Sequence, residues 1–286
     1  MSEMQKRHKD FVQSQEAGAL PFTLDSSSKR GVISASVRAF LPDISFSLFS
    51  KQLSQVGQWC EFVTLHLNIK SCSFRTDLIP QKLGFYVGVK GYLTPDQASL
   101  LLMNFESETV EDVLRINFSA KDGPYDSSNY DFRVRAIGVT NASGKEGVYL
   151  EFDFSSVPGY VSSLANVYFL TVARKKVGFS IAGKTWSGAP KYVRGQRGAA
   201  ERNVVRYLLA IKVYFETLDI LEGQRYEESL QRWFDATQEY KKQLYEMDRE
   251  TYLSIKDRER QNQFILMEAR ASNTKPIYHP EIQKLR

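Results

Sequence analysis

Glu201-Arg-Asn-Val-Val-Arg-Tyr-Leu-Leu-Ala-Ile-Lys-Val-Tyr-Phe-Glu-Thr-Leu218 is the clearest helical stretch in the chain. Apolar residues recur there every three to four positions, which is the period of one face of an α-helix, at Val204, Leu208, Ile211, Phe215 and Leu218. The other face carries Arg206, Lys212 and Glu216. A helix of this length can lie across a β-sheet, and the preceding residues predict that sheet.

Before this helix the sequence has the period of β-strands. Ile33, Ala35, Val37 and Ala39 alternate with polar residues, and Pro42 and Asp43 end this strand and begin a helix that runs to about Cys60. From there to Asp153 nearly every segment reads as a strand, and the predicted ranges are 63–72, 83–92, 99–106, 110–119, 129–139 and 147–154. The short connections favour an antiparallel meander. The predicted class is therefore α+β.

Three segments are expected along the chain. Residues 1–16 predict a charged helix or a loose arm and 25–30 predict a loop, so 1–30 is expected to be an N-terminal arm. Residues 31–222 form the main domain, with a helix expected at 160–176. Residues 223–286 form a C-terminal extension with charged helices at about 225–246 and 248–270, and then a loose tail.

Composition excludes several classes of protein. The chain has 286 residues, of which 42% are apolar and 25% charged, and this is a globular composition rather than a disordered or collagen-like one. No apolar run approaches the roughly 18–20 residues that span a bilayer, and the first ten residues lack the apolar core of a signal peptide. The net charge of +5 is mild. Without a basic stripe interleaved with aromatic residues, we expect no nucleic-acid partner.

Cysteine and histidine usage leaves one question open. The two cysteines, Cys60 and Cys72, flank an apolar-alternating run, and they are either two reduced buried thiols or a disulfide formed across a bend. The three histidines, His8, His66 and His279, are far apart in sequence, and no CxxC or HExxH spacing exists. We therefore expect no metal and no cofactor.

One literal motif match is misleading. The residues from Gly178 to Thr185 satisfy GxxxxGK[ST], the pattern of a phosphate-binding loop. Such a loop needs a helix that begins at its Lys-Thr pair, so that free amides meet the phosphates. Here turn residues, Trp186 to Pro190, follow instead. We therefore expect no nucleotide site.

Two polar stretches supply candidate site residues. The run Leu65 to Lys70 alternates, so that His66, Asn68 and Lys70 share one face of the predicted strand. That face is either exposed to solvent or lines a cavity, where Lys70 would meet an anionic head group and His66 would exchange a proton. In the loop from Arg194 to Asn203, Arg197 and Arg202 could hold a carboxylate or phosphate; alternatively the glycines serve a tight turn and Glu201 pairs with an arginine.

The order of elements resembles a known architecture. One strand, a helical segment, about six antiparallel strands and a long amphipathic helix is the order of the helix-grip fold, so the chain resembles the START-like (SRPBCC) superfamily over about residues 31–220. This resemblance implies a curved sheet around the long C-terminal helix, with an apolar cavity between them. The superfamily includes lipid-transfer domains, pollen-allergen-like binders and polyketide cyclases, so it hosts both carriers and enzymes.

Three motifs look like a family of uncharacterised, often secreted proteobacterial proteins. They are the stretches from Trp59 to Cys72, from Arg174 to Phe179 and from Val193 to Asn203. This resemblance implies a Cys60–Cys72 disulfide and a periplasmic location if an upstream signal peptide was removed, and otherwise a cytoplasmic one. It brings no established activity.

The combined expectation is a binding protein. Residues 31–222 would hold a hydrophobic small molecule or lipid between sheet and helix, with polar contacts from His66, Asn68, Lys70, Arg197 and Arg202. Peripheral membrane contact is a possible further interaction, and the sequence names no protein partner. Two alternatives remain open: a cyclase- or hydrolase-like enzyme with His66 as general base, and a scaffold that acts through the C-terminal helices.

Overall fold

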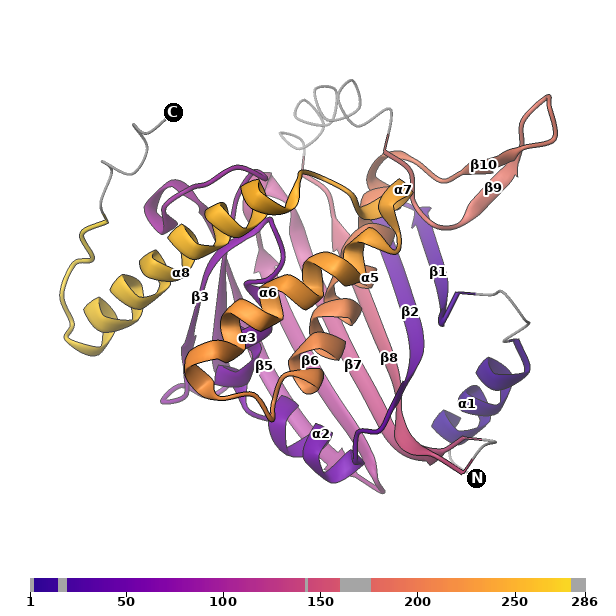
Figure 1. Ribbon diagram of the computed structural model, residues 1–286, viewed down its shortest axis with the longest axis horizontal. Helices are drawn as coiled ribbons and strands as arrows, with labels where there is room; N and C mark the ends of the chain where they lie inside the picture. Colours follow the sequence, from indigo (N-terminus) through magenta and orange to yellow (C-terminus); the bar gives the residue numbers. More distant parts are fainter. Residues whose placement is uncertain (1–2, 15–19, 142–143, 160–175, 279–286) are drawn as a thin grey trace.

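The computed structural model describes residues 3–14, 20–141, 144–159 and 176–278. Its main layer is an antiparallel sheet in the order β1-β2-β8-β7-β6-β5-β4-β3 (Figure 1). The strands are β1 (Phe22–Lys29), β2 (Val32–Pro42), β3 (Ile69–Arg75), β4 (Gln81–Val87), β5 (Ser99–Val110), β6 (Val113–Asp122), β7 (Ser128–Thr140) and β8 (Glu146–Val157). The antiparallel α+β fold predicted from the sequence is confirmed.

The predicted alternation holds in β2. Ile33, Ala35, Val37 and Ala39 are buried, while the residues between them are half-buried. In the neighbouring strand β8, Phe152 pairs with Val37, and Leu150 pairs with Ala39. Because side chains opposite each other in a sheet point to the same face, these pairs build one continuous apolar face.

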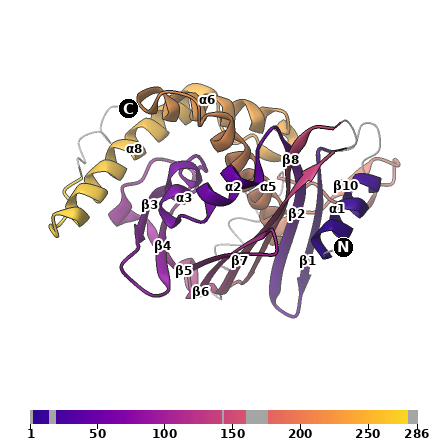
Figure 2. The ribbon, with the colours of Figure 1, turned by 90° about the horizontal axis from the view of Figure 1, so that it is seen from below.

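Helix α5 (Gly195–Glu216) lies across the concave side of this sheet, as Figure 2 shows. The predicted apolar face is buried at Val204, Leu208, Ile211 and Phe215. The opposite face is also largely covered, because α6 (Glu222–Gln238) packs against it. This cover buries Arg206, which the sequence placed on an exposed face. The predicted helix before β3 is present as two short helices, α2 (Phe46–Leu53) and α3 (Val56–Val63).

The C-terminal helices α6, α7 (Lys241–Leu244) and α8 (Arg249–Ala271) pack on the domain. Trp233 of α6 stacks on Tyr252 of α8 at a centroid distance of 5.3 Å. The phenol of Tyr252 donates to the carbonyl of Leu65 at 2.9 Å. Phe22, Trp233 and Tyr252 all belong to the same hydrophobic cluster as the sheet and α5, so the N-terminal and C-terminal segments share its core.

Helix α8 also covers the sheet edge formed by β3. The Gln263 amide nitrogen donates to the carbonyl of Cys72 at 2.6 Å, and its oxygen accepts from the Cys72 N–H at 2.7 Å. A side-chain amide thus takes the place of a neighbouring strand. Edge strands of sheets are commonly protected by such a cover.

One expectation about the N-terminal segment needs correction. Residues 25–30 were expected to form a loop, but residues through Lys29 belong to β1, which pairs with β2. The run Asp25-Ser-Ser-Ser has low strand propensity, and pairing with β2 overrides it. Helix α1 (Glu3–Ser14) packs Met4 and Phe11 against Tyr149 on the convex side of the sheet. The helix expected at 160–176 lies almost wholly outside the described residues.

Cys60 of α3 and Cys72 of β3 are joined by a disulfide, with their Cα atoms 5.3 Å apart. Of the two alternatives that the sequence left open, the structure has the bonded pair. Among the described helices, none is both long and apolar enough to cross a membrane.

Candidate ligand-binding site

A cavity of about 250 Å³ lies between the concave side of the sheet and the first half of α5. Its walls come from strands β3, β4, β5, β7 and β8 and from α5. Residues that are far apart in the sequence therefore line the same cavity. The apolar part of the lining consists of Ile69, Phe85, Val87, Leu101, Phe132, Phe154 and Val204. A cavity with such walls favours an apolar ligand, because binding removes the apolar surfaces of both the ligand and the cavity from water.

The polar part of the lining is cationic. Lys90, Arg202 and Arg206 line the cavity, and the first and last of these bind a single carboxylate, Glu246. Lys90 Nζ lies 2.5 Å from Glu246 Oε2, and Arg206 Nη2 lies 2.6 Å from Oε1. Lys176 also reaches Oε2, at 2.9 Å. One carboxylate thus meets three cations, and Arg202 adds a fourth positive charge nearby.

The pKa shifts reflect this excess of positive charge. Burial and, to a smaller extent, the neighbouring Arg206 lower the pKa of Arg202 to about 10. Burial also lowers the pKa of Lys90 to about 8, although Glu246 opposes the shift. Burial alone would raise the pKa of Glu246, but Arg206 and Lys90 outweigh it and bring the value to about 2. Glu246 is therefore ionised at neutral pH, and the cations around it still exceed its charge.

His66 lies in the cavity wall. Its ring is 2% exposed and stacks on Tyr207 at a centroid distance of 5.3 Å. Nδ1 accepts the backbone N–H of Asn68 at 3.0 Å, whereas buried Nε2 makes no hydrogen bond of good geometry to a described residue and interacts with the side chain of Asn203, which also lines the cavity. Burial lowers the pKa of His66 well below 6.5, and Arg206 adds to this effect. The ring is neutral at pH 7, and since Nδ1 accepts, its proton is on Nε2.

The predicted strand through Leu65–Asn68 is instead a turn that precedes β3. His66 and Asn68 of this turn nevertheless lie in the cavity wall. The Asn68 side-chain amide donates to the carbonyl of Gly88 at 3.0 Å. This bond ties the turn before β3 to the residue that follows β4. Three of the five predicted polar residues, His66, Asn68 and Arg202, thus come together in this cavity.

Lys70 and Arg197 lie elsewhere. Lys70 is fully buried under α8, where its Nζ pairs with Glu259 Oε1 at 3.0 Å. Arg197 Nε donates to the hydroxyl of Ser26 at 2.7 Å, so it ties the start of α5 to β1. Neither residue lines the cavity. Their partners are more than 170 positions away in sequence, which is why the local pattern gave no sign of them.

Arg206, Lys90 and Tyr207 were not predicted as site residues. A signal for Arg206 exists in the sequence, since it follows Arg202 by four positions and therefore shares its helix face. Lys90 follows β4 in a loop, and no local pattern marks it. The Glu246 carboxylate that joins Lys90 to Arg206 comes from the connection between α7 and α8.

The residues that match a phosphate-binding loop have another role. The Glu201 carboxylate accepts the N–H groups of Phe179 at 2.7 Å and Ser180 at 3.0 Å. A Cβ atom at Gly178 would lie 2.2 Å from Glu201 Oε2, so glycine is required for this close approach. The following Lys184 ends a short strand and does not begin a helix. Amides that would hold a phosphate are thus already occupied.

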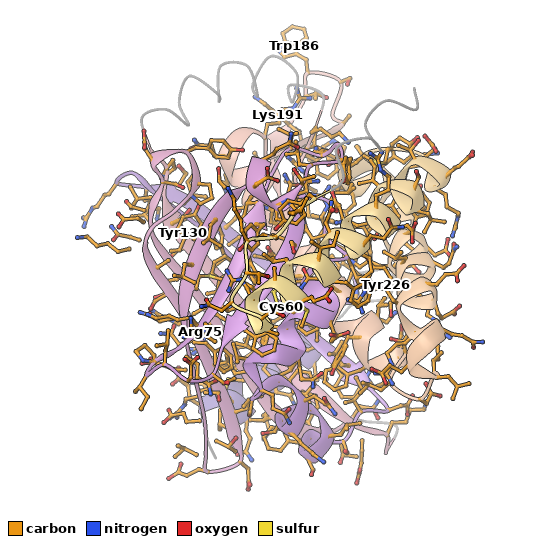
Figure 3. The ribbon with its side chains drawn as sticks, turned by 90° about the vertical axis from the view of Figure 1, so that its left-hand side faces the viewer. Cys60, Arg75, Tyr130, Trp186, Lys191 and Tyr226 are labelled. Atoms are coloured by element: carbon orange, nitrogen blue, oxygen red, sulfur yellow. A yellow bond between two sulfur atoms is a disulfide. The ribbon has the colours of Figure 1, made fainter. Side chains whose placement is uncertain are left out.

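A second hollow is larger and more open. It has a volume of about 750 Å³ and lies between α3, α6 and α8, near Tyr226 (Figure 3). The guanidinium of Arg260 covers the rings of Tyr226 and Phe264 there, at 4.5 and 4.7 Å from their centroids. We place the site in the smaller cavity because it contains the buried cations and the buried Nε2 of His66. In the part of the chain that the structure describes, no three His, Cys, Asp or Glu side chains gather to hold a metal ion.

Comparisons with known proteins add the following. No family model and no curated protein matches the chain. Human STARD10 is similar in structure at 10% identity and a TM-score of 0.32, over 61% of this chain and 76% of that chain. A conserved protein of unknown function from Enterococcus faecalis has 7% identity and a TM-score of 0.32, over 84% and 92% of the two chains. A START superfamily protein from Mycobacterium smegmatis has 16% identity and a TM-score of 0.26, over 50% and 92%.

These TM-scores are below 0.5, so the fold assignment depends on the strand order and on the position of α5, and no activity is transferred. One strand, two short helices, six meandering strands and a helix held in the concave face are all present in the order that the sequence predicts. The chain therefore has a helix-grip fold, extended by β1 at one edge of the sheet and by α8 at the other.

Proposed function

We propose that the chain binds a compact, mainly apolar molecule with one acidic group in the cavity between the sheet and α5. The observation that carries this proposal is the pairing of an apolar cavity with three largely buried cations, Lys90, Arg202 and Arg206, that outnumber the two carboxylates beside them, Glu246 and Glu201. Burial of apolar ligand surface contributes about 25 cal/mol of favourable free energy per Å² removed from water. The contact between the acidic group and these cations would fix the orientation of the ligand in the cavity.

The size of the cavity limits the class of ligand. Its volume of about 250 Å³ is just below the range of about 300–1,000 Å³ that is typical of drug-sized ligands. A phospholipid with two acyl chains is far larger. A short fatty acid or an aromatic acid with one or two rings suits the space.

His66 is suited to donate a hydrogen bond to such a ligand. Its Nε2–H is buried in the cavity wall beside the Asn203 side chain and makes no hydrogen bond of good geometry to a described residue, so a carboxylate oxygen would satisfy it. The enzyme alternative needs His66 as a base, but Nδ1 is occupied by the Asn68 N–H and Nε2 carries the proton. The scaffold alternative needs a filled core between sheet and helix, whereas a cavity is present.

Paired titrations test the role of charge. Octanoate and octan-1-ol have the same chain and differ in the acidic group, so isothermal titration calorimetry with both isolates the contribution of that group. We expect octanoate to bind about tenfold more tightly or better, as hydrogen bonds to charged groups contribute about 1.5–3 kcal/mol. Arg202→Gln should reduce this preference and leave octanol binding unchanged.

Lys212→Gln is the matched control, because it removes a partly exposed cation from the same helix, where Lys212 pairs with Glu216 and with no other described residue. It should leave both affinities as they are. Equal affinity of the wild type for octanoate and octanol would overturn the acidic-ligand proposal. Absence of binding by both probes, together with no small molecule bound to the freshly purified protein in native mass spectrometry, would overturn ligand binding itself.

We also propose that the protein works in an oxidising compartment such as the periplasm. The Cys60–Cys72 disulfide supports this location, because reducing compartments keep thiols free. A thiol-reactive mass tag, added at cell lysis under denaturing conditions, should leave the protein unlabelled. Two tags per chain would show reduced cysteines and contradict the proposal. Pretreatment with a reductant is the positive control and should add both tags.

A further inference from the structure

A two-stranded hairpin projects from the end of the molecule at which α5 begins (Figure 1). It consists of β9 (Ile181–Lys184) and β10 (Pro190–Tyr192). Trp186 lies in its turn, at the tip that Figure 3 shows, and its side chain is fully exposed. Ile181 in the same hairpin is 63% exposed.

Trp186 differs from the other two tryptophans of the chain. Trp59 and Trp233 are both 2% exposed and lie in the core. The turn that carries Trp186 is closed by its own hydrogen bonds: the Thr185 N–H donates to the carbonyl of Ala189 at 2.7 Å, and the Ala189 N–H donates to the Thr185 hydroxyl at 3.0 Å. These bonds hold the indole away from the body of the protein. An exposed indole has an apolar body and a polar N–H, and tryptophan is enriched for this reason at interfaces where one end of the ring is apolar and the other is wet.

The hairpin itself carries charge of one sign, whereas Lys176 before it pairs with Glu246. Residues 176–200 contain no Asp or Glu, and they contain Lys176, Lys184, Lys191, Arg194 and Arg197. Lys184 and Lys191 are exposed on the hairpin itself. Next to it, Lys242 of α7 lies over the ring of Tyr192 at 4.1 Å. The surface thus combines an exposed indole with lysines and suits an anionic partner that has an apolar layer.

Hydrogen bonds join the residues just before the hairpin to the part of α5 that lines the cavity. The Glu201 carboxylate of α5 accepts the N–H groups of Phe179 and Ser180 just before β9. Arg202, the next residue, lines the cavity and donates to the carbonyl of Val177 at 3.2 Å. A surface bound by the hairpin would therefore be held at the end of the molecule where the cavity's cationic part lies.

We propose that the β9–β10 hairpin binds the surface of a bilayer that contains anionic lipids. Trp186 enters the interfacial layer, where indole rings are favoured, and Lys184 and Lys191 meet the head groups. A single ring at a narrow tip suits shallow insertion better than nucleic-acid binding, which stacks successive bases on several rings along a groove. The inference is independent of ligand binding, since the hairpin would bind the membrane whether the cavity is filled or empty.

Tryptophan fluorescence and vesicle sedimentation test this inference. With vesicles of phosphatidylcholine and phosphatidylserine, we expect a blue shift of the emission and its quenching by lipids brominated on the acyl chain. With phosphatidylcholine alone, binding should be much weaker. Trp186→Ala should weaken binding by about tenfold. Lys184→Glu with Lys191→Glu should weaken it by at least about fivefold for each lysine. Trp186→Phe should retain most of the binding.

Matched variants distinguish a local effect from a general one. Ile79→Ala removes an equally exposed apolar side chain from the β3–β4 turn, close to Arg75, which Figure 3 places far from Trp186. Lys6→Glu with Lys9→Glu on α1 changes the net charge by the same amount as the hairpin pair. Both controls should bind vesicles like the wild type, and octanoate affinity should be unchanged in every variant. No binding to anionic vesicles, or equal losses in Trp186→Ala and Ile79→Ala, would overturn the inference.

Discussion

At the scale of a single residue, His66 is kept neutral by its surroundings. Burial is the largest cause of its lowered pKa, and Arg206, Lys256 and Lys70 each disfavour a second positive charge there. The side chain of Asn203 opposes this shift but does not offset it. A ring that stays neutral keeps the same proton on Nε2 throughout the physiological range, and so offers the same donor to a ligand.

The lowered pKa of His66 predicts a loss of stability in acid. The unfolded chain takes up this proton near pH 6.5, and the folded chain only well below that value, so the unfolded state binds more protons in between. The free energy of unfolding should therefore fall as the pH drops below about 6.5. His66→Gln should flatten this dependence in urea titrations at a series of pH values.

His8 supplies the comparison. Burial lowers its pKa as well, but His8 is only half-buried on α1, where its ring contacts Tyr149 of β8. His8→Gln should remove a smaller part of the pH dependence than His66→Gln does. If the two variants remove equal parts, or if neither changes the slope, the assignment to the buried His66 ring is wrong.

At the scale of an element, helix α8 forms hydrogen bonds with the edge strand β3 that a further strand would otherwise form. Besides the Gln263 amide on Cys72, its Lys256 Nζ donates to the carbonyls of His66 and Ile69, each at 2.9 Å. Glu259 then pairs with both Lys256 and Lys70. The helix therefore satisfies polar groups of the turn and edge strand that carry His66, and its position determines the shape of one cavity wall.

Replacing Gln263 should destabilise this edge. Gln263→Leu keeps a similar volume but leaves the buried N–H and carbonyl of Cys72 without partners. Each such group costs about 1–3 kcal/mol, so the free energy of unfolding should fall by about 2 kcal/mol or more. Urea denaturation measures this change.

Gln261→Leu on the same helix is the control, since Gln261 is exposed and bonds only to Asp257 on that helix. It should change stability by less than about 0.5 kcal/mol, as exposed substitutions do. Similar decreases in the free energy of unfolding of the two variants would show that the contact between Gln263 and β3 does not stabilise the protein more than an exposed side chain does.

At the scale of the whole molecule, periodicity predicted the architecture. The alternation in β2 and the helical period of α5 each reflect one buried face, so local sequence was sufficient. The strand β1 was missed because its serines resemble a loop, and its pairing with β2 is a tertiary effect. The site was predicted in part: His66, Asn68 and Arg202 line the cavity, but Lys90 and Arg206 meet only through Glu246, which lies far away in the chain.

The two edges of the sheet differ, and this difference limits how copies of the chain can associate. Addition of strands from other molecules requires a free edge, and α8 occupies the one at β3. The other edge, β1, pairs only with β2 among the described strands. Two copies joined through β1 would form a symmetric pair with no edge left over, whereas a fibre needs two edges per copy. Among the described edges of the main sheet, only β1 can therefore accept a strand from another copy, and such pairing would join two copies and no more.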